Sequence, residues 1–357
     1  MKILIVAGGQ GTKMWPYSRT DKPKQFQKIV GEETPYENNI NTLLKEFPAE
    51  DIFVSTKRKF IKYVSEQSPQ IPLKNYIIEP DIAKDRGPGE GLAFLRLSMV
   101  CPGEPFFMVQ SDCYREPAEE FLKMIRQAEK LVKKHKKLIT GGIKATEPSI
   151  GVDYLQLGQN LDDDAYAIDK FVFRKDTMKE TRELIQSFHV VTHCNHMCWY
   201  PELALEAYKK YRPDWYEKLM AIKEAIDNPG EHEAVERLYS EMEKGATEEV
   251  TTNVMDKGEA IVILLPFKWT DLGTWSSVYD YFSTTPENYE DGNVVSVDTT
   301  GSLIKSSHKD KLIAVAGVED MVIVDTDDVL LVIPKEKIDK IKNIQAVLTE
   351  RESTEYL

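Results

Sequence analysis

The sequence predicts an α/β fold built on a mixed, mostly parallel sheet with helices on both faces, plus a small C-terminal all-β domain. Short apolar runs alternate with helical patterns through the first half of the chain, which is typical of a parallel sheet covered by helices. After Glu287, short apolar runs are separated by Asp, Gly, Thr and Lys turns, which is typical of regularly spaced strands. We therefore expect two domains, residues 1–286 and 287–357, with their boundary near residues 284–293.

The predicted strands of the first half are short and strongly apolar. They cover residues 2–7, 52–55, 76–79, 106–110 and 138–143. Between the last two, apolar residues from Phe121 to Val132 fall on one helical face, with Lys and Glu on the other. Ligands of such sheets bind outside the carboxyl ends of the strands. Residues 8–11, Asp112 and residues 141–142 each follow a predicted strand, so we expect these three segments to meet at one rim.

The second half of the chain is predicted to begin with charged helices and to end in short strands. Residues 201–253 are strongly helical, and residues 261–265 form a returning strand that leads to the segment 269–275. The strands of the C-terminal domain are expected at residues 294–297, 302–304, 312–316, 321–324 and 329–333. Their spacing fits either a β-coil or a sandwich, closed by a final helix over residues 338–350.

The composition is that of an acidic globular protein. The 357 residues are 41% hydrophobic and 29% charged, with a net charge of −13 at pH 7. This charge opposes binding to nucleic acid or to an anionic membrane, because such binding depends mainly on Lys and Arg. No leader pattern precedes the first strand, and no apolar stretch approaches the roughly 20 residues of a spanning helix. We expect no nucleic acid partner, no membrane association and a cytoplasmic location, and a homodimer is compatible with these features.

Four cysteines, at positions 101, 113, 194 and 198, are too few and too scattered for a disulfide framework and are expected to be reduced thiols. The segment 193–198 has the residue types of a metal site. If residues 190–200 form one strand, then Cys194, His196 and Cys198 share a face, but the outer two lie about 13 Å apart. That distance is too long for one zinc ion, so a structural strand is the stronger interpretation.

A loop rich in glycine follows the first predicted strand and is here called the glycine loop: Gly8, Gly9, Gln10, Gly11, Thr12 and Lys13. Without Cβ atoms at three positions, successive backbone N–H groups can turn toward one anion, while Thr12 and Lys13 add a hydroxyl and a charge. The basic residues from position 13 to 28 are Lys13, Arg19, Lys22, Lys24 and Lys28, against the single acid Asp21. A bound polyanion is therefore expected, although a tight turn beside a solvated basic face would explain the glycines alone.

Two common glycine motifs do not match this loop. A dinucleotide fingerprint that starts at Gly9 needs glycine or alanine at the position of Met14. A P-loop needs Gly-Lys-Ser/Thr where this chain has Gly11-Thr12-Lys13. A dinucleotide-dependent oxidoreductase is therefore disfavoured.

Two aspartates near predicted strand ends are candidate ligands for a divalent cation. Asp112 follows the apolar run 106–109, and Asp271 precedes Gly273. Two protein oxygen ligands together with substrate phosphates are the usual way in which Mg²⁺ is bound. A turn or helix-cap role is the alternative for each aspartate taken alone.

The order of residues around the glycine loop resembles the signature of the sugar-nucleotide pyrophosphorylases. That signature reads Gly-Gly-x-Gly-Thr-basic-x-Trp-Pro and then Pro-Lys-Gln-Phe, and residues 8–16 and 23–26 match it. The Trp-Pro and Lys-Gln-Phe portions, together with residues 292–328, are similar to the mannose-1-phosphate guanylyltransferase branch. The resemblance covers almost the whole chain. It implies a Rossmann-like, GT-A-like nucleotidyltransferase domain over residues 1–286.

The resemblance also implies a metal site and a reaction. Residues 110–113 are similar to the family's Pro-Ser-Asp-His and residues 269–275 to its Trp-x-Asp-x-Gly-x-Trp, which implies Mg²⁺ on Asp112 and Asp271. The implied reaction transfers a nucleotidyl group from GTP to a sugar-1-phosphate, with mannose-1-phosphate as the first expectation. Lys24 would lie beside the α-phosphate and Lys13 near the leaving pyrophosphate, so the catalytic set is Lys13, Lys24, Asp112 and Asp271.

Other matching segments imply contacts with the base and with the sugar phosphate. Lys84 and Asp85 fall in the segment that borders the base in the family, and they join residues 8–12 as expected nucleotide-binding residues. Gly151, Arg174 and Asn195 fall at positions that border the sugar and its phosphate.

The chain departs from the family pattern mainly at positions expected near the sugar. The unusual residues are Arg86, Glu90, Cys113, Phe173 and Met197. On the phosphate side Lys13 replaces the usual arginine, which keeps the charge but gives up a bidentate contact. The alternatives are therefore the same reaction with a different sugar-1-phosphate, or a regulatory homologue that binds nucleotide sugar without catalysis.

Overall fold

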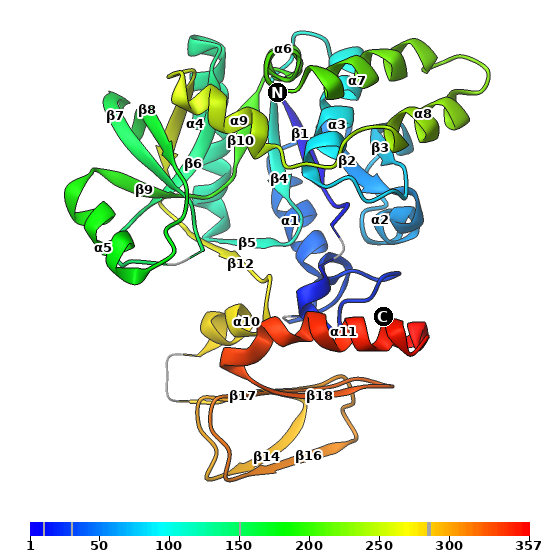
Figure 1. The fold of residues 1–357 in the computed structure, drawn as a ribbon, viewed down its shortest axis with the longest axis vertical. Coiled ribbons are helices and arrows are strands. Elements are labelled where there is room, and N and C mark those ends of the chain that lie inside the picture. Colours follow the sequence, from blue (N-terminus) through cyan, green and yellow to red (C-terminus); the bar gives the residue numbers. More distant parts are fainter. Residues whose placement is uncertain (10, 30, 150, 284–286) are drawn as a thin grey trace. The chain divides into compact units, whose positions relative to one another are not determined.

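The computed structural model describes residues 1–9, 11–29, 31–149, 151–283 and 287–357 of the chain. These residues form two compact units (Figure 1). The first comprises Met1–Gly8, Thr42–Gln110 and Arg115–Lys268, and the second comprises Gly9–Asn41, Ser111–Tyr114 and Trp269–Leu357. The second unit thus combines most of the glycine loop with the C-terminal strands. The predicted boundary at residues 286–287 stays a prediction, because residues 284–286 lie outside the described part.

The described part of the first unit is built on one mixed sheet of ten strands, in the order β11-β8-β7-β9-β6-β10-β4-β1-β2-β3, with β11 also paired to β6. The strands are β1 (Lys2–Val6), β2 (Ile52–Lys57), β3 (Tyr76–Glu79), β4 (Phe106–Gln110), β6 (Leu138–Lys144), β7 (Tyr154–Asp162), β8 (Ala165–Val172), β9 (Val190–His193), β10 (Met197–Trp199) and β11 (Ala260–Leu264). β1 runs parallel to β2 and β4, β2 to β3, and β6 to β11. All five strands predicted in the first half are present.

Helices cover both faces of this sheet. α3 (Arg86–Val100) lies on one face, where Phe94 stacks on Phe106 with ring centres 5.1 Å apart. α4 (Ala118–His135) lies on the other face, where Phe121 contacts the next residue of the same strand, Phe107, at 6.1 Å. Because successive side chains of a strand point to opposite faces, β4 is covered on both sides. The predicted α/β class is confirmed.

The predicted helical stretch 201–253 consists of four helices. They are α6 (Pro201–Tyr211), α7 (Pro213–Ala225), α8 (Glu231–Ser240) and α9 (Glu248–Asp256). Pro213 starts α7, as expected for a residue that cannot continue a helix, and Gly230 with a φ of 82° precedes α8. The other helices are α1 (Pro35–Leu43), α2 (Ile61–Gln67) and α5 (Met178–Ser187). No helix in the described part combines the length and apolar character needed to cross a membrane.

The predicted single strand over residues 190–200 is wrong. β9 ends at His193 and β10 begins at Met197, because Asn195 between them has a positive φ of 56° that a strand cannot contain. Burial raises the pKa of the Cys194 thiol to about 12 and also raises that of Cys198. All four cysteines are free, which confirms the prediction of reduced thiols.

The C-terminal part of the second unit is a coil of parallel strands. β13 (Tyr289–Asp291), β15 (Leu303–Ser306) and β17 (Met321–Asp325) pair in parallel, and β18 (Leu330–Pro334) pairs antiparallel with β17. β14 (Asn293–Val297) and β16 (Leu312–Ala316) form a second parallel pair. Of the two predicted alternatives, the parallel pairing confirms the β-coil.

Helices and the N-terminal segment complete the core of the second unit. α10 (Trp275–Phe282) and α11 (Ile341–Glu350) lie on the same side of the coil (Figure 1). A 3₁₀ turn, Lys335–Lys340, precedes α11 where one final helix was predicted. Trp275 is fully buried, and its indole Nε1 donates a hydrogen bond to the backbone oxygen of Trp15 at 2.9 Å. The short strands β5 (Cys113–Glu116) and β12 (Lys268–Asp271) pair with each other.

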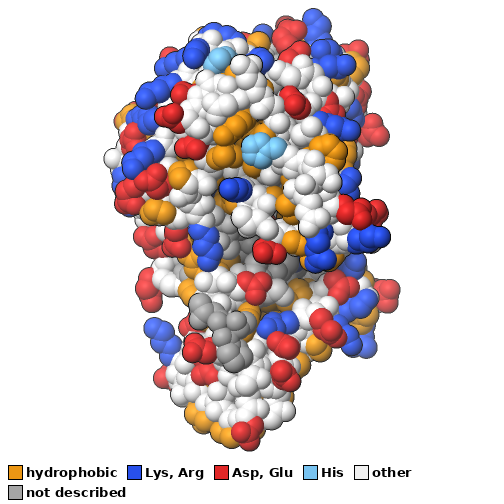
Figure 2. All heavy atoms as spheres, turned by 90° about the vertical axis from the view of Figure 1, so that its left-hand side faces the viewer, with side chains coloured by type: hydrophobic (Ala, Val, Ile, Leu, Met, Phe, Trp, Pro, Cys, Tyr) orange, Lys and Arg blue, Asp and Glu red, His pale blue; other side chains and the backbone are white. Residues whose placement is uncertain are grey.

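The surface carries charges of both signs. The chain has 46 basic and 59 acidic residues, and on the face drawn in Figure 2 the two kinds are interspersed rather than gathered in separate tracts.

Candidate active site

The first glycine of the loop lies against a buried glutamate. A Cβ atom at Gly8 would lie 3.2 Å from Oε1 of Glu79, and one at Gly89 would lie 2.8 Å from its Oε2. Glu79 ends β3, and its carboxyl group accepts a hydrogen bond from the Ser55 hydroxyl at 2.9 Å. Burial raises the pKa of Glu79. A Cβ atom at position 8 or 89 would therefore crowd the carboxyl group of this buried side chain, which was not predicted as a site residue.

The third glycine of the loop makes room for a lysine. Gly11 has a φ of 64°, and a Cβ atom there would lie 2.6 Å from Cγ of Lys24. The neighbouring Gln25 donates from Nε2 to the backbone oxygen of Gly9 at 2.9 Å. Around Gly9 a Cβ atom would meet nothing within 4 Å, so the backbone is accessible there. The Lys-Gln-Phe segment therefore packs beneath the glycine loop, and this contact places the Lys24 side chain.

Lys24 lies between the two predicted aspartates. Its Nζ is 2.8 Å from Oδ2 of Asp112 and 3.2 Å from Oδ1 of Asp271, and it is 3.4 Å from the backbone oxygen of Leu272. Asp112 lies in the turn between β4 and β5, whereas Asp271 ends β12. The three side chains come from the three segments that make up the second unit. The structure thus brings Lys24, Asp112 and Asp271 together.

The charges of this cluster depend on one another. Burial opposes the charge of Lys24, but the Asp112 and Asp271 carboxylates raise its pKa above the ordinary value, so it stays an ammonium. Burial also raises the pKa of Asp271, while Lys24 lowers it and Asp112 raises it. One ammonium and two carboxylates leave a net charge of −1, and a further cation would be attracted there.

The oxygen atoms of this cluster fit a hard divalent cation. In the described part of the chain, Asp112, Cys113 and Asp271 form a group whose ligand atoms all lie within 4.8 Å of one another. Carboxylate oxygens are the ligands that Mg²⁺ prefers, whereas a thiol is a soft ligand. The donor set therefore suits an ion held by two carboxylates, with Cys113 as a buried neighbour.

An asparagine missed by the sequence argument holds the turn that carries Asp112. Asn39 is buried in α1, and its Nδ2 donates to the backbone oxygens of Pro35 at 2.8 Å and Cys113 at 3.0 Å. A 3.4 Å contact joins the same nitrogen to the backbone oxygen of Ser111. Nothing in the local sequence of α1 indicates this role, because it depends on a contact with residues 72 and 74 positions away.

The remaining residues of the glycine loop are described only in part. Lys13 is exposed in the 3₁₀ turn Thr12–Met14, and its charge lowers the pKa of Asp271 against the larger, opposite effect of burial. Gln10 lies outside the described residues. Thr12 is placed by its backbone alone, within that turn.

The two predicted base-side residues lie in the first unit, just before α3. Asp85 has a φ of 68°, and its Oδ1 accepts a hydrogen bond from the backbone nitrogen of Arg86 at 2.9 Å. It is therefore the N-cap of α3. The backbone oxygen of Lys84 accepts from the nitrogen of Gly245 at 3.2 Å.

The three predicted sugar-side residues also lie in the first unit. Gly151 has a φ of 90° and open space around it. Arg174 forms an ion pair with Asp153, with Nη2 to Oδ2 at 3.1 Å, which offsets part of the charge it could offer to a phosphate. Asn195 donates from Nδ2 to Oε1 of Glu248 at 3.2 Å.

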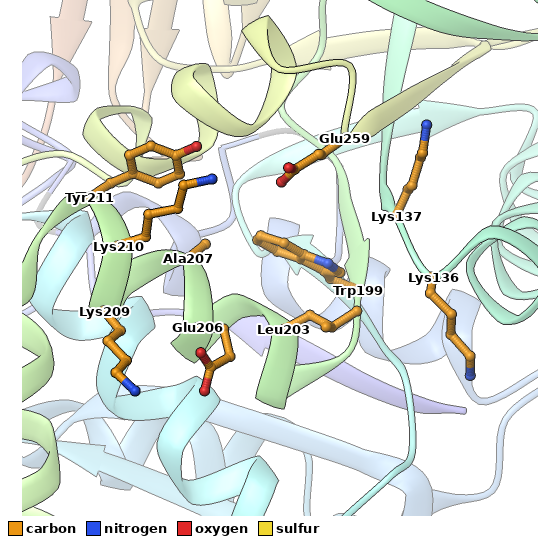
Figure 3. A pocket seen from close by; sticks show the side chains of 10 residues that line it. All are labelled: Lys136, Lys137, Trp199, Leu203, Glu206, Ala207, Lys209, Lys210, Tyr211 and Glu259. Carbon is orange, nitrogen blue, oxygen red and sulfur yellow. The ribbon is translucent and has the colours of Figure 1, made fainter.

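A separate pocket in the first unit does not contain these residues. It has a volume of about 480 Å³, and its lining includes Trp199, Tyr211 and several lysines. Figure 3 shows the side chains of Lys136 and Lys137 pointing in opposite directions, so their ammonium groups do not converge on one ligand position.

Comparison with known proteins finds similarity in both parts of the chain. The model of the Nucleotidyl transferase family matches residues 2–174, and that of the MannoseP isomerase/GMP-like beta-helix domain matches residues 292–348. Mannose-1-phosphate guanylyltransferase of Klebsiella pneumoniae is 28% identical over 365 residues, covering 99% of this chain and 75% of the relative. Alginate biosynthesis protein AlgA of Pseudomonas aeruginosa is 24% identical over 346 residues, covering 96% and 70%.

Solved structures share the fold. The structure titled mannose-1-phosphate geranyltransferase, from Thermus thermophilus, matches with a TM-score of 0.84 and 22% identity, covering 98% of this chain and 99% of that one. The structure titled mannose-6-phosphate isomerase, from Helicobacter pylori, matches with a TM-score of 0.59 and 17% identity, covering 76% and 100%. The two domain models match in the predicted order and the relatives align across both, so the chain is similar to the mannose-1-phosphate guanylyltransferases over nearly its whole length.

Proposed function

We propose that this protein transfers a guanylyl group from GTP to a sugar-1-phosphate, with mannose-1-phosphate as the first candidate, to give a GDP-sugar and pyrophosphate. The observation that carries the proposal is the position of Lys24, which is buried between Asp112 and Asp271 beneath the glycine loop. The named activity of the full-length relatives supports the choice of substrates.

The reaction needs positioned charge rather than a covalent intermediate. An oxygen of the sugar-1-phosphate attacks the α-phosphorus of GTP in line, the new P–O bond forms, and the bond to the β-phosphate oxygen breaks to release pyrophosphate. Lys24 is fixed by two carboxylates, so its ammonium can offset negative charge at the α-phosphate without reorganising. Lys13, exposed on the loop, is assigned to the leaving pyrophosphate.

We propose Mg²⁺ as the cofactor, held by Asp112 and Asp271. When bound, it would supply Lewis-acid neutralisation of the phosphates. The support from this chain is the oxygen donor set and the net negative charge of the cluster.

The test is release of pyrophosphate from GTP with a panel of sugar-1-phosphates, with ATP and UTP as nucleotide controls. Turnover with mannose-1-phosphate and GTP is expected. No turnover with any sugar would contradict the proposal. GDP-mannose binding by calorimetry without turnover would instead favour the regulatory alternative.

The assembly and cellular location are also proposals. Val295 and Val297 of β14 and Leu312 of β16 are at least half exposed, and their apolar side chains support a homodimer. Light scattering of the wild type and of Val297→Lys would test this, with a smaller mass expected for the variant. Phosphorylated substrates and four free cysteines support a cytoplasmic protein, which acts without nucleic acid or membrane.

A further inference from the structure

A second group of charged side chains lies in the first unit, away from the Lys24 cluster in the sequence. It is here called the Arg86 network and consists of Arg86, Glu90, Asn195, Thr247 and Glu248. Arg86 begins α3 with Glu90 one turn further on, Thr247 and Glu248 stand at the start of α9, and Asn195 lies in the break between β9 and β10. Three distant parts of the chain therefore supply it.

Glu90 is the structural member of this network. It is buried, and its Oε1 accepts from Nε of Arg86 at 2.8 Å while its Oε2 accepts from the Thr247 hydroxyl at 2.6 Å. Both oxygens are thus engaged, as a buried carboxylate requires. Arg86 and Glu90 also balance each other in charge.

Glu248 differs from Glu90 because only part of its carboxylate is engaged. Oε1 accepts from Nη1 of Arg86 at 2.9 Å and from Nδ2 of Asn195 at 3.2 Å, and the side chain is 26% exposed. In the described part of the chain, the second oxygen, Oε2, accepts no hydrogen bond from another residue. Burial opposes its charge, but Arg86 and Asn195 lower the pKa of Glu248, so it is an ionised acceptor with a fixed orientation.

The network lies at the ligand-binding edge of the sheet. Arg86 follows β3 in the chain, and Gln110 at the carboxyl end of β4 donates from Nε2 to the backbone oxygen of Asn195 at 2.5 Å. Open α/β sheets bind ligands outside the carboxyl ends of their strands. The exposed part of Glu248 therefore belongs to the edge at which substrates bind.

The charge of the network decides which part of a substrate it can accept. One guanidinium and two carboxylates give a net charge of −1, which repels a phosphate group. A neutral sugar ring offers hydroxyl donors, and hydrogen bonds from hydroxyls to an ionised carboxylate are stronger than those to a neutral acceptor. The chemical class that fits is a polyol, presented as free hydroxyls.

We infer that Glu248 is a specificity-determining residue that accepts hydrogen bonds from hydroxyls of the sugar ring, and that Arg86 is the positioning residue that orients it. This inference rests on the proposed transfer to a sugar-1-phosphate and names the groups that read the sugar. Asn195 then acts through Glu248, because its amide nitrogen is already donated to that carboxylate.

The test compares Glu248→Gln with Glu249→Gln. Glu249 is the next residue of the same helix turn and pairs with Arg212, so its replacement makes the same chemical change outside the network. Glu248→Gln leaves Arg86 paired with Glu90 and should fold. The expected result is a KM for sugar-1-phosphate raised on the order of 10- to 100-fold, an unchanged KM for GTP, and weaker discrimination between mannose-1-phosphate and glucose-1-phosphate.

A second variant tests the positioning role. Arg86→Lys keeps the charge but cannot contact Glu90 and Glu248 in the same planar geometry, so it should reproduce the altered sugar selectivity while GTP binding by calorimetry is retained. Glu248→Gln with wild-type KM and selectivity for every sugar would overturn the inference and leave the proposed function intact. Failure of the wild type to use any sugar-1-phosphate would overturn both.

Discussion

Burial alone would disfavour the charged form of Lys24, but the carboxylates of Asp112 and Asp271 stabilise its ammonium group. Replacing it by methionine keeps most of the volume but leaves Asp112 and Asp271 facing each other without a cation. We expect Lys24→Met to lose activity on the order of 100- to 1,000-fold, the scale of removing one preorganised charge-stabilising donor. Pyrophosphate release measures the loss. Lys28→Met, at an exposed position in the same segment, should keep wild-type activity, and equal losses in both variants would refute the special role of Lys24.

Gly11 combines two constraints that a pair of variants can separate. Gly11→Ala adds a side chain at a φ of 64° and also crowds Cγ of Lys24 at 2.6 Å, whereas Gly103→Ala meets a φ of 75° with open space around it. Gly103→Ala should lose about 1 kcal/mol of unfolding free energy in urea, the cost of the left-handed backbone, and Gly11→Ala should lose more because it also crowds Lys24. Only Gly11→Ala should also lose activity, because Lys24 must move. Full activity in Gly11→Ala would show that the close packing is dispensable.

At the scale of elements, two buried histidines at the break between β9 and β10, His193 and His196, should make the free energy of unfolding depend on pH. Burial lowers the pKa of His193 to about 4 and also lowers that of His196. The unfolded chain binds protons on both residues below about pH 6.5, while the folded chain binds them only at lower pH. The unfolded state therefore gains stability as the pH falls, and the unfolding free energy should drop between about pH 6.5 and 4.

The size of this effect can be measured with urea unfolding at a series of pH values. For His193 alone the shift corresponds to about 3 kcal/mol at most. His193→Gln should flatten the pH profile, whereas His308→Gln, at a 37% exposed side chain, should leave its slope unchanged. Identical slopes in all three proteins would contradict the assignment.

The same element shows where sequence reasoning stops. The apolar runs that became β1, β2, β3, β4 and β6 could be predicted because strands buried on both faces read as continuous hydrophobic segments. The positive φ of Asn195 could not be predicted, since this residue makes its hydrogen bonds with Gln110 and Glu248, which lie in other parts of the chain. β7 and β8 were also missed, because both contain several exposed polar residues.

At the scale of the whole molecule, nucleotide and metal should stabilise the fold by mass action. GTP at about 100 times its Kd should add about 2.7 kcal/mol to the unfolding free energy, seen as a higher Tm, and Mg²⁺ should increase the shift. Asp112→Asn and Asp271→Asn should lose the Mg²⁺-dependent part. A magnesium effect that persists in both variants would remove the metal assignment.

The central residues of the candidate site could be predicted because each lies in a short sequence segment with a recognisable order of residues. Lys24, Asp112 and Asp271 are 88 or more positions apart, yet each follows a recognisable segment, and the structure brings them together. Asn39 and Glu79 were not predicted as site residues. Each acts through a contact with a distant backbone or glycine, and a single sequence carries no record of such contacts.

The second unit takes its core from both ends of the chain. Trp15 and Ile29 lie in the same buried cluster as Leu303 and Val322, so the coil packs with side chains that follow the glycine loop. A hybrid enzyme that exchanged the C-terminal coil alone would combine surfaces from two parents inside one core. A chimaera would need crossover points after Gly8, after Asn41 and near Lys268. The short segment Ser111–Tyr114 would also have to come from the same parent, so that the chimaera inherits the whole second unit.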